Sequence, residues 1–206
     1  MIIIMKTEPT AARSRRRSAA TRSRILAAAA AAIRRRGPAR VGVLEVMREA
    51  GLTHGGFYAH FASRDDLVAA AIRGIFAEGP DRFARRTAGL EGIAALRAWI
   101  DSYVSPAHRD NAAGGCALPA LVSDMPHLEP AARQAFDDGL RGIAARLAAH
   151  LPDRKDFDAD GFTLALVCTM AGAVALSRAV TDPGFSGRIL DSARAELQAR
   201  LDRFES

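Results

Sequence analysis

The chain has only two cysteines, Cys116 and Cys168, and they lie far apart in a sequence of 206 residues. Zinc sites and disulfide frameworks use cysteines at paired spacings, so this pattern excludes both and favours a reducing, cytoplasmic compartment. Aromatic residues make up only 6% of the chain, whereas alanine is abundant. A β-sandwich would need more aromatic and β-branched residues, so the composition predicts closely packed helices.

A long hydrophobic run is also absent. The most apolar segment, residues 157–180, has an uninterrupted apolar core over about residues 164–176, and this core includes Thr169. A membrane span needs roughly 20 apolar residues, so we expect a helix that is buried on most of its sides, and no membrane association. The opening Met1-Ile2-Ile3-Ile4-Met5 is too short for the apolar region of a signal peptide, and either methionine can be the start of the protein.

No set of side chains has the spacing of a catalytic or metal-binding site. The acidic clusters at residues 137–138 and 156–160 fall near predicted helix ends, where carboxylates cap helices or face solvent. His108, His127 and His150 lack metal-ligand spacing. The sequence therefore predicts a protein that is not an enzyme and that holds neither a metal nor a cofactor.

Negative charge is scarce in the first third of the chain. Residues 1–65 hold 13 Lys/Arg and only 4 Asp/Glu, a net charge of +9, whereas the remainder holds 16 against 19 and is slightly acidic. A basic region confined to one end is the electrostatic footprint of a nucleic-acid-binding head. The alternative, a basic stretch that only solvates a surface, fits less well because the charge coincides with the motif described below.

The spacing of apolar residues predicts an all-α fold of about nine helices. We expect a disordered basic arm over residues 1–17, a helix-turn-helix head of three helices over residues 18–64, and a helical body over residues 65–206. The predicted helices cover residues 18–36, 43–50, 53–60, 63–79, 90–104, 118–123, 129–151, 157–180 and 187–204.

Local signals mark several of these boundaries. Ser63 and Asp66 have the spacing of a capping box at the start of the fourth helix, and Gly79-Pro80 ends or kinks that helix. Residues 105–115 contain one proline and the pair Gly114-Gly115, so they are predicted to form a mobile loop.

Residues 50–61 read as a helix end, a tight turn and a short helix. Gly51 ends the first helix, and Thr53 is expected to cap the next one with its side chain. This is the form of a helix-turn-helix that reads DNA. Phe57 and Phe61 are large and apolar, so they should face the core. The residues left to face DNA or its rim are Thr53, His54, Gly55, Gly56, Tyr58, Ala59 and His60.

Two glycines inside so short a helix need a reason, since each costs roughly 1 kcal/mol relative to alanine. Gly55 and Gly56 either let the backbone lie close to base edges or only shape the turn. Tyr58 and His60 can contact phosphate oxygens, or they can be core residues with satisfied polar tips.

The segment from Ala50 to Leu67 resembles the signature of TetR-type (tetracycline-repressor-like) transcriptional regulators. It has the alanine-glycine pair, the small-residue turn, an aromatic residue before Tyr58, the pair His60-Phe61, and then a serine cap with a basic residue and an acidic-hydrophobic helix start. The resemblance covers about 45 residues from Ile25 onward. It implies a homodimeric, all-helical protein that binds double-stranded DNA, usually a repressor released by a small ligand.

The same resemblance assigns roles to residues of the short helix. It implies that bases are read at His54, Gly55, Gly56 and Ala59, and that phosphates are held by Thr53, Tyr58, His60 and Arg64. The chain departs from the family pattern because its reading helix presents very few side chains to the bases. His54, backbone contacts, the basic arm and DNA shape would therefore carry more of the specificity.

The last two helices are the expected dimer surface. Two heads about 34–36 Å apart would read successive major grooves, and two helices per subunit would build a four-helix interface. The alternative is that their apolar stripe is only intramolecular core. The expected contact residues are Ala165, Ala171, Gly172, Ala173 and Ala175, with Leu166, Val174, Leu176, Ile189, Leu190, Leu197 and Leu201.

The helices between the head and the dimer surface could enclose a ligand cavity. The predicted ligand-binding residues are Trp99, Tyr103, Cys116, Met125, Phe136 and Phe162, with Phe76, Phe83, Leu118 and Met170 as further candidates for the lining. Each of these is also compatible with an ordinary place in the core.

Cys116 carries a sharper hypothesis. It follows Gly114-Gly115 and is predicted to open a helix, where a thiol becomes more reactive. It also resembles a branch of the TetR family that senses electrophiles or oxidants through a cysteine. We therefore expect Cys116 to contact the inducer or to be modified by it; the alternative is a small packed residue. Cys168 is expected to be inert.

Together these features predict a ligand-responsive transcription regulator, a repressor released from a palindromic operator by a small molecule. Two alternatives stay open. The first is a helical ligand-binding or enzymatic protein with a vestigial head, which would have no affinity for DNA. The second is a sequence-independent architectural DNA binder, which would bind all DNA alike.

Overall fold

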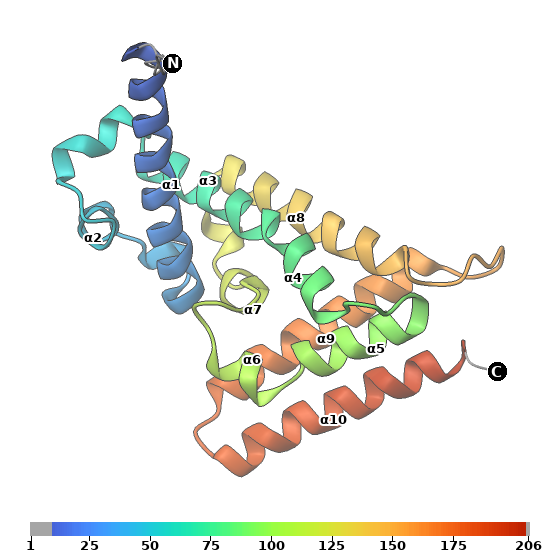
Figure 1. Cartoon of the computed structure of the whole chain (residues 1–206). Helices are drawn as coiled ribbons and strands as arrows, with labels where there is room; N and C mark the ends of the chain where they lie inside the picture. Colours follow the sequence, from blue (N-terminus) through green and yellow to red (C-terminus); the bar gives the residue numbers. More distant parts are fainter. Residues whose placement is uncertain (1–9, 205–206) are drawn as a thin grey trace, which may run out of the picture.

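The computed structural model describes residues 10–204, and over that range it contains ten α-helices, three short 3₁₀ helices and no strand (Figure 1). The predicted all-α fold is confirmed. The helices are α1 (Thr10–Arg36), η1 (Pro38–Arg40), α2 (Val43–Glu49), η2 (His54–Ala59), α3 (Arg64–Ala77), α4 (Gly79–Arg86), α5 (Gly92–Tyr103), α6 (Pro106–Asp110), α7 (Leu118–Leu121), η3 (Met125–His127), α8 (Pro130–Ala148), α9 (Ala159–Ala179) and α10 (Pro183–Asp202).

Helix α1 is longer than predicted. It begins at Thr10, so residues 10–17 of the predicted disordered arm are helical, while residues 1–9 of that arm lie outside the described residues. Alanine and arginine are strong helix formers, and no glycine or proline occurs within residues 10–36. The basic segment is therefore a continuation of the first head helix over residues 10–17.

The turn after α2 is built as the sequence indicates, except at Thr53. Gly51 has a φ of 67° and closes α2 with two hydrogen bonds, from its own N–H to the Arg48 oxygen (3.0 Å) and from the Leu52 N–H to the Met47 oxygen (2.8 Å). This pair of bonds satisfies the last carbonyls of the helix. The Thr53 side chain makes no capping hydrogen bond; its carbonyl instead accepts from the Gly56 N–H at 3.1 Å.

The start of α3 has the predicted cap. The Asp66 N–H donates to the Ser63 hydroxyl at 3.1 Å, and the Asp66 carboxylate accepts from the Ala62 N–H at 3.2 Å. Helix α3 ends at Ala77, and α4 begins again at Gly79-Pro80, so this pair interrupts the helical run as predicted. Figure 1 shows α3 and α8 side by side, leading from the head toward α4 and α5.

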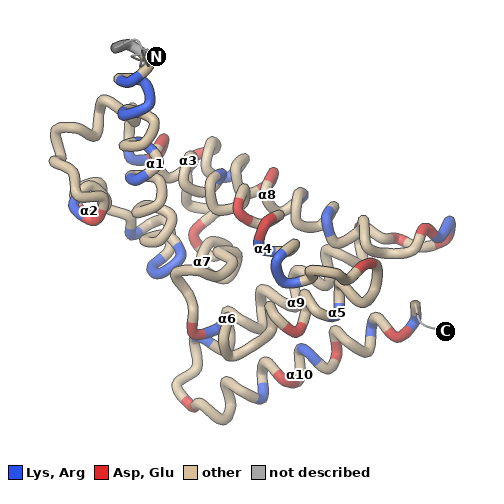
Figure 2. The backbone as a smooth tube through the Cα atoms, in the orientation of Figure 1, with Lys and Arg blue, Asp and Glu red and all other residues tan. Residues whose placement is uncertain are grey.

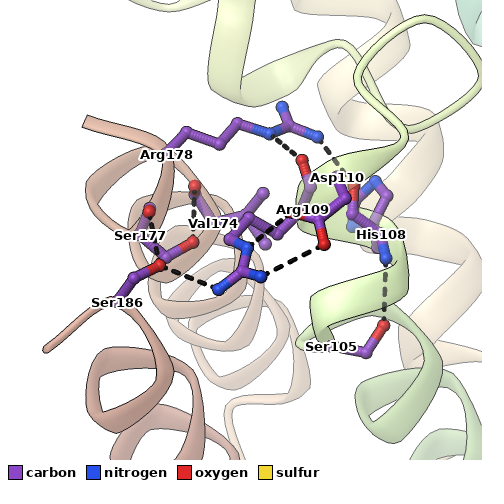
Figure 3. A network of polar contacts seen from close by, with 8 residues as sticks. All are labelled: Ser105, His108, Arg109, Asp110, Val174, Ser177, Arg178 and Ser186. Carbon is purple, nitrogen blue, oxygen red and sulfur yellow. Dashed lines mark hydrogen bonds and ion pairs between the residues drawn. The ribbon is translucent and has the colours of Figure 1, made fainter. Parts of the chain in front are cut away.

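The predicted mobile loop at residues 105–115 contains helix α6, which the sequence reading missed. The Ser105 hydroxyl caps it by accepting from the His108 N–H at 3.2 Å. Arg178 of α9 donates to the carbonyls of Arg109 (2.8 Å) and His108 (2.9 Å), and Arg109 donates to the Ser186 hydroxyl of α10 at 2.9 Å (Figure 3). These contacts from two distant helices hold the segment in place.

Two apolar clusters form the core, and two phenylalanines join them. The first cluster packs α1, α2, η2 and α3 together and continues into α7 and α8; the second lies among α4, α5, α8, α9 and α10. Phe76 of α3 and Phe136 of α8 pack against both clusters, with their ring centroids 5.9 Å apart in an edge-to-face contact. The core of the head is therefore continuous with that of the body.

Helix α9 is less buried than predicted. By length and composition alone it could cross a membrane, with a mean hydropathy of 1.7, but only 33% of that window is buried inside the chain. One face packs on α8 and α10, and the other exposes residues such as Leu164, Cys168 and Leu176. The prediction of a helix buried on most sides is therefore wrong, because α9 has one unpartnered face.

Candidate functional site

The short helix η2 projects from the head with its polar side outward. Phe57 and Phe61 are buried, as predicted, and stack with their ring centroids 5.8 Å apart. Tyr58 is 70% exposed and makes an edge-on contact with the exposed His54 ring. Thr53, Gly55 and Ala59 are also exposed, whereas Gly56 and His60 are partly buried. Five of the seven predicted DNA-facing residues of this segment are therefore exposed, and the other two are partly exposed.

The two glycines of η2 are not required by the backbone. Neither Gly55 nor Gly56 has a positive φ, in contrast to Gly51. A Cβ added at Gly55 would meet nothing within 4 Å, and at Gly56 it would meet only the Met47 Cε at 3.8 Å. Shaping of the turn therefore does not explain these glycines, and close approach of the backbone to another molecule stays a sufficient reason for them.

Arg64 has a different position from the one expected of a phosphate contact. Its Nε donates to the Val41 oxygen at 2.9 Å, and its Nη2 donates to the oxygens of Pro38 (2.7 Å) and Ala39 (2.9 Å). Its Nη1 pairs with Asp65 at 3.1 Å. Most guanidinium donors are thus engaged within the chain, so Arg64 ties the start of α3 to the connection between α1 and α2.

Basic side chains concentrate on the free end of α1. Figure 2 shows Lys and Arg along the first turns of this helix, beside the end of the head that carries η2. Arg13, Arg17 and Arg22 are exposed there. The predicted basic arm is therefore partly a rigid helix, which presents its charges at fixed positions relative to η2.

The body contains a small, mainly apolar cavity between α4, α5, α8 and α9. Its volume is about 30 Å³, and its walls include Phe83, Leu118 and Met170. Three of the six predicted ligand-binding residues, Trp99, Tyr103 and Cys116, line it. The cavity has room for about one water molecule.

An open vestibule of about 640 Å³ shares part of this wall. Arg82, Trp99, Tyr103 and Cys116 line both spaces, so the cavity and the vestibule lie on the two sides of the same residues. The vestibule wall also carries arginines that sequence reasoning missed, because exposed arginines resemble an ordinary solvated helix face. These arginines are Arg85 and Arg86, while Arg146 lines the inner cavity.

The other three predicted ligand-binding residues lie elsewhere. Met125 belongs to the first apolar cluster, and Phe136 joins the two clusters against Phe76. Phe162 packs with Phe157 and Phe204 near the end of α10. None of the three lines the cavity or the vestibule. The structure therefore does not bring these three residues to either space, because the sequence does not reveal how each helix is rotated about its axis.

Cys116 does not open a helix, since α7 begins two residues later and has only four residues. Its backbone N–H donates to the Nε2 of His108 at 2.9 Å. The Nδ1 of His108 lies 2.7 Å from the backbone carbonyl oxygen of Tyr103. A backbone N–H can only donate, so Nε2 is unprotonated and Nδ1 carries the proton. A Cβ on Gly115 would lie 2.6 Å from the His108 ring, which explains the glycine before Cys116.

His108 should make the protein less stable in mild acid. Burial lowers the pKa of His108 from 6.5 to about 4, and the facing Arg178, Arg82 and Arg86 guanidinium groups add to the effect, against the hydrogen bond to Tyr103. Between pH 6.5 and 4 the unfolded chain binds a proton that the folded protein does not, so stability falls as the pH falls.

We expect the free energy of unfolding to drop by about 1–2 kcal/mol more for the wild type than for His108→Gln between pH 7 and pH 5. Urea unfolding of both proteins at the two pH values measures the difference. Equal drops would contradict a neutral, buried His108.

One carboxylate connects the cavity to the head. Glu78, between α3 and α4, accepts a hydrogen bond from Arg82 at 3.1 Å, and the same oxygen pairs with Arg34 of α1. Arg34 is buried, and its Nε has no hydrogen-bond partner in the described part of the chain. Since Arg82 lines both the cavity and the vestibule, Glu78 links the wall of these spaces to the first head helix.

Comparison with known proteins identifies two family regions. Residues 25–71 match the family model for bacterial regulatory proteins of the tetR family, and residues 92–193 match that for the tetracyclin repressor-like C-terminal domain. No curated protein matches the chain.

Several solved structures have the same fold. A TetR transcriptional regulator from Chloroflexus aurantiacus J-10-FL is 26% identical with a TM-score of 0.74, over 91% of this chain and 96% of that chain. The reduced form of NemR from E. coli is 21% identical with a TM-score of 0.72, over 86% and 94%. Regulatory protein TetR from Rhodobacter sphaeroides is 20% identical with a TM-score of 0.71, over 86% and 96%. For the last two structures, at 21% and 20% identity, the similarity shows only a shared fold.

Proposed function

The chain belongs to the TetR family of bacterial regulatory proteins, and on this premise we propose that it is a cytoplasmic, homodimeric repressor that leaves its operator when a small molecule binds beside Trp99. The family and the fold make it a DNA-binding regulator. The observation that carries the proposal is the exposed polar face of η2 at the basic end of the molecule. A vestigial head would not require an exposed polar face of η2 at a basic end of the molecule.

We assign DNA contacts to seven residues of this face. His54, Gly55, Gly56 and Ala59 would lie against the bases, while Thr53, Tyr58 and His60 would hold phosphates. Arg64, whose donors serve the carbonyls described above, would support the head from within. With so few side chains on η2, direct contacts to bases would be sparse, and DNA shape and the charges of α1 would add to recognition.

Titration of DNA from around the protein's own gene against random DNA, at one fixed salt concentration, tests the proposal. We expect specific binding at least about a thousandfold tighter than binding to random DNA. Equal affinity for both would indicate an architectural DNA binder, and no affinity for either would indicate a vestigial head.

Two substitutions separate phosphate contacts from base contacts. Tyr58→Phe removes one hydroxyl and should weaken binding to all sequences alike, by about three- to tenfold. His54→Ala should chiefly reduce the preference for the operator over random DNA, since it removes the largest base-facing side chain. If His54→Ala leaves that preference intact, recognition of the operator depends on α1 and on DNA shape.

A dimer would use the exposed faces of α9 and α10. Leu176 is 60% exposed, and Leu164 of the same helix and Phe185 of α10 are also exposed. Of the apolar residues predicted at this surface, however, Leu166, Val174, Leu190, Leu197 and Leu201 are buried within one chain. They build the intramolecular core, so the contact would rest on the outer residues. Sedimentation at micromolar concentration tests this, and a single-chain mass would contradict it.

A ligand response needs a connection between the cavity and the head. The shared carboxylate Glu78 supports one, because it contacts Arg82 in the cavity wall and Arg34 in α1. The paired rings of Phe76 and Phe136 support a second, apolar route. A ligand that moves α4 would therefore alter the position of α1, which carries the basic side chains of the head.

Modification of Cys116 is a second candidate for the signal. Its thiol lines both the cavity and the vestibule, and the related NemR structure is described as a reduced form. We expect Cys116→Ser to abolish release of operator DNA by N-ethylmaleimide, with Cys168→Ser, at the exposed face of α9, as the matched control. Unchanged release in Cys116→Ser, with every electrophile or oxidant tested, would exclude this mechanism.

A further inference from the structure

Two residues that line both the cavity and the vestibule have a buried polar atom without a hydrogen-bond partner in the described part of the chain. The Trp99 Nε1 and the Tyr103 hydroxyl make no hydrogen bond within the described part of the chain, although the residues are only 9% and 5% exposed. A buried polar group without a partner is costly. An indole N–H can only donate, so the missing partner of Trp99 is an acceptor, whereas the Tyr103 phenol can donate or accept and lies beside the Cys116 side chain.

The vestibule is strongly cationic. Arg82, Arg85 and Arg86 of α4 line it, and Asp101 is the single carboxylate among its lining residues in the described part of the chain. One oxygen of that carboxylate accepts from the Gln198 amide at 2.8 Å. Burial lowers the pKa of the Arg82 guanidinium, which is therefore already partly desolvated. Removing water from charged groups strengthens their attraction for an opposite charge.

The histidine of the vestibule offers nothing to a ligand donor. Both nitrogens of His108 are engaged, one with the Cys116 N–H and one with the Tyr103 carbonyl. The lining therefore presents three guanidinium groups, which can only donate, against one carboxylate, and its remaining polar groups are neutral. Beyond the junction, the inner cavity is walled by apolar side chains, including Phe83, Val167 and Met170.

We propose that this site binds an amphipathic organic anion, with a carboxylate-type group among Arg82, Arg85 and Arg86 and an apolar body directed past Trp99 into the inner cavity. The proposal rests on the proposed ligand-responsive function, and it adds the chemical class of the ligand. The vestibule, at about 640 Å³, is within the size range of small-molecule sites, whereas the inner cavity of about 30 Å³ has to widen to admit the apolar body. That widening displaces α4, which carries the arginines.

The single tryptophan of the chain makes a direct test possible. Trp99 is the only tryptophan, so its fluorescence reports on this site and on nothing else. The probes are octanoate, cyclohexylacetate and 3-phenylpropionate, each compared with the alcohol of the same skeleton and with the corresponding amine. We expect each carboxylate that binds to do so about tenfold or more tightly than its alcohol, and the amines not to bind.

The double variant Arg85→Gln/Arg86→Gln should bring the affinity for the carboxylate to within about threefold of that for the alcohol. The control, Arg133→Gln/Arg141→Gln, removes two exposed arginines of α8 that do not line the vestibule, and it should keep the preference. All four residues are exposed, so folding should be retained, and an unchanged Tm verifies it.

Three results would overturn the proposal: alcohols that bind as tightly as carboxylates across the panel, a preference that survives Arg85→Gln/Arg86→Gln, or no carboxylate binding at millimolar concentration. Since these titrations contain no DNA, they are independent of the repressor function. A carboxylate that binds with the expected preference but leaves operator DNA bound would support the ligand class and contradict the ligand-responsive function.

Discussion

Arg64→Ala is expected to destabilise the protein by about 2–4 kcal/mol. The substitution removes three charge-assisted hydrogen bonds, to the oxygens of Pro38, Ala39 and Val41, and leaves the oxygen of the buried Val41 without this partner. The side chain is 34% exposed, so water replaces part of the loss. Urea unfolding measures the change. Arg73→Ala, at an exposed position on the same helix, is the matched control and should change stability by less than about 0.5 kcal/mol.

The DNA-binding behaviour of the same variant separates a supporting arginine from a phosphate contact. A lost phosphate contact lowers the slope of log affinity against log salt by about 0.9. We expect the slope for Arg64→Ala to stay unchanged and the loss of affinity to follow the loss of folded head. Arg64→Lys should recover less than half of the stability, since an ammonium lacks the planar fork that reaches several carbonyls at once. A reduced salt slope together with unchanged stability would instead indicate that Arg64 contacts a DNA phosphate.

Gly139→Ala is the second large effect, with an expected loss of about 2–3 kcal/mol. A Cβ at this position of α8 would lie 2.2 Å from the Cγ of Phe76. That atom joins the ring to its stem, so the ring cannot swing aside without moving α3, and overpacking of this kind costs about 1–3 kcal/mol or more. The gain in helix propensity, roughly 1 kcal/mol, offsets only part of this.

The same helix contains a matched control. A Cβ at Gly142 would meet nothing within 4 Å, and the position is exposed. Gly142→Ala should therefore raise the free energy of unfolding by about 0.5–1 kcal/mol. Thermal or urea unfolding of the two single variants measures both effects. If Gly139→Ala and Gly142→Ala shift stability in the same direction, α3 and α8 are not in the close contact described.

The head could be predicted in detail because its signals are local. Gly51 ends α2, the Ser63 cap starts α3, and the alternation of Phe57 and Tyr58 separates the core from the exposed face. Each of these depends on residues within a few positions along the chain. The role of Arg64 escaped prediction because its acceptors lie more than twenty residues away.

The body was harder to predict because its features depend on contacts between distant segments. Helix α6 follows from a serine cap and from Arg178, a partner about seventy residues away. Trp99, Tyr103 and Cys116 were predicted at the cavity, but so were Met125, Phe136 and Phe162, which have the same apolar character and face other ways. The sequence did not single out the arginines of α4. They become notable only because they line the same space as the unpartnered polar atoms of Trp99 and Tyr103.

The two glycines of η2 have a consequence for how this protein can evolve. Side chains could be added at Gly55 without steric conflict and at Gly56 with ordinary contact to Met47, and neither backbone position is restricted to glycine. A duplicated gene could therefore acquire a new operator through single substitutions at these positions, with no compensating change in the core. Under the proposed DNA-binding role, the exposed surface of η2 is in this sense free to diverge, while the buried residues of the head are constrained by packing.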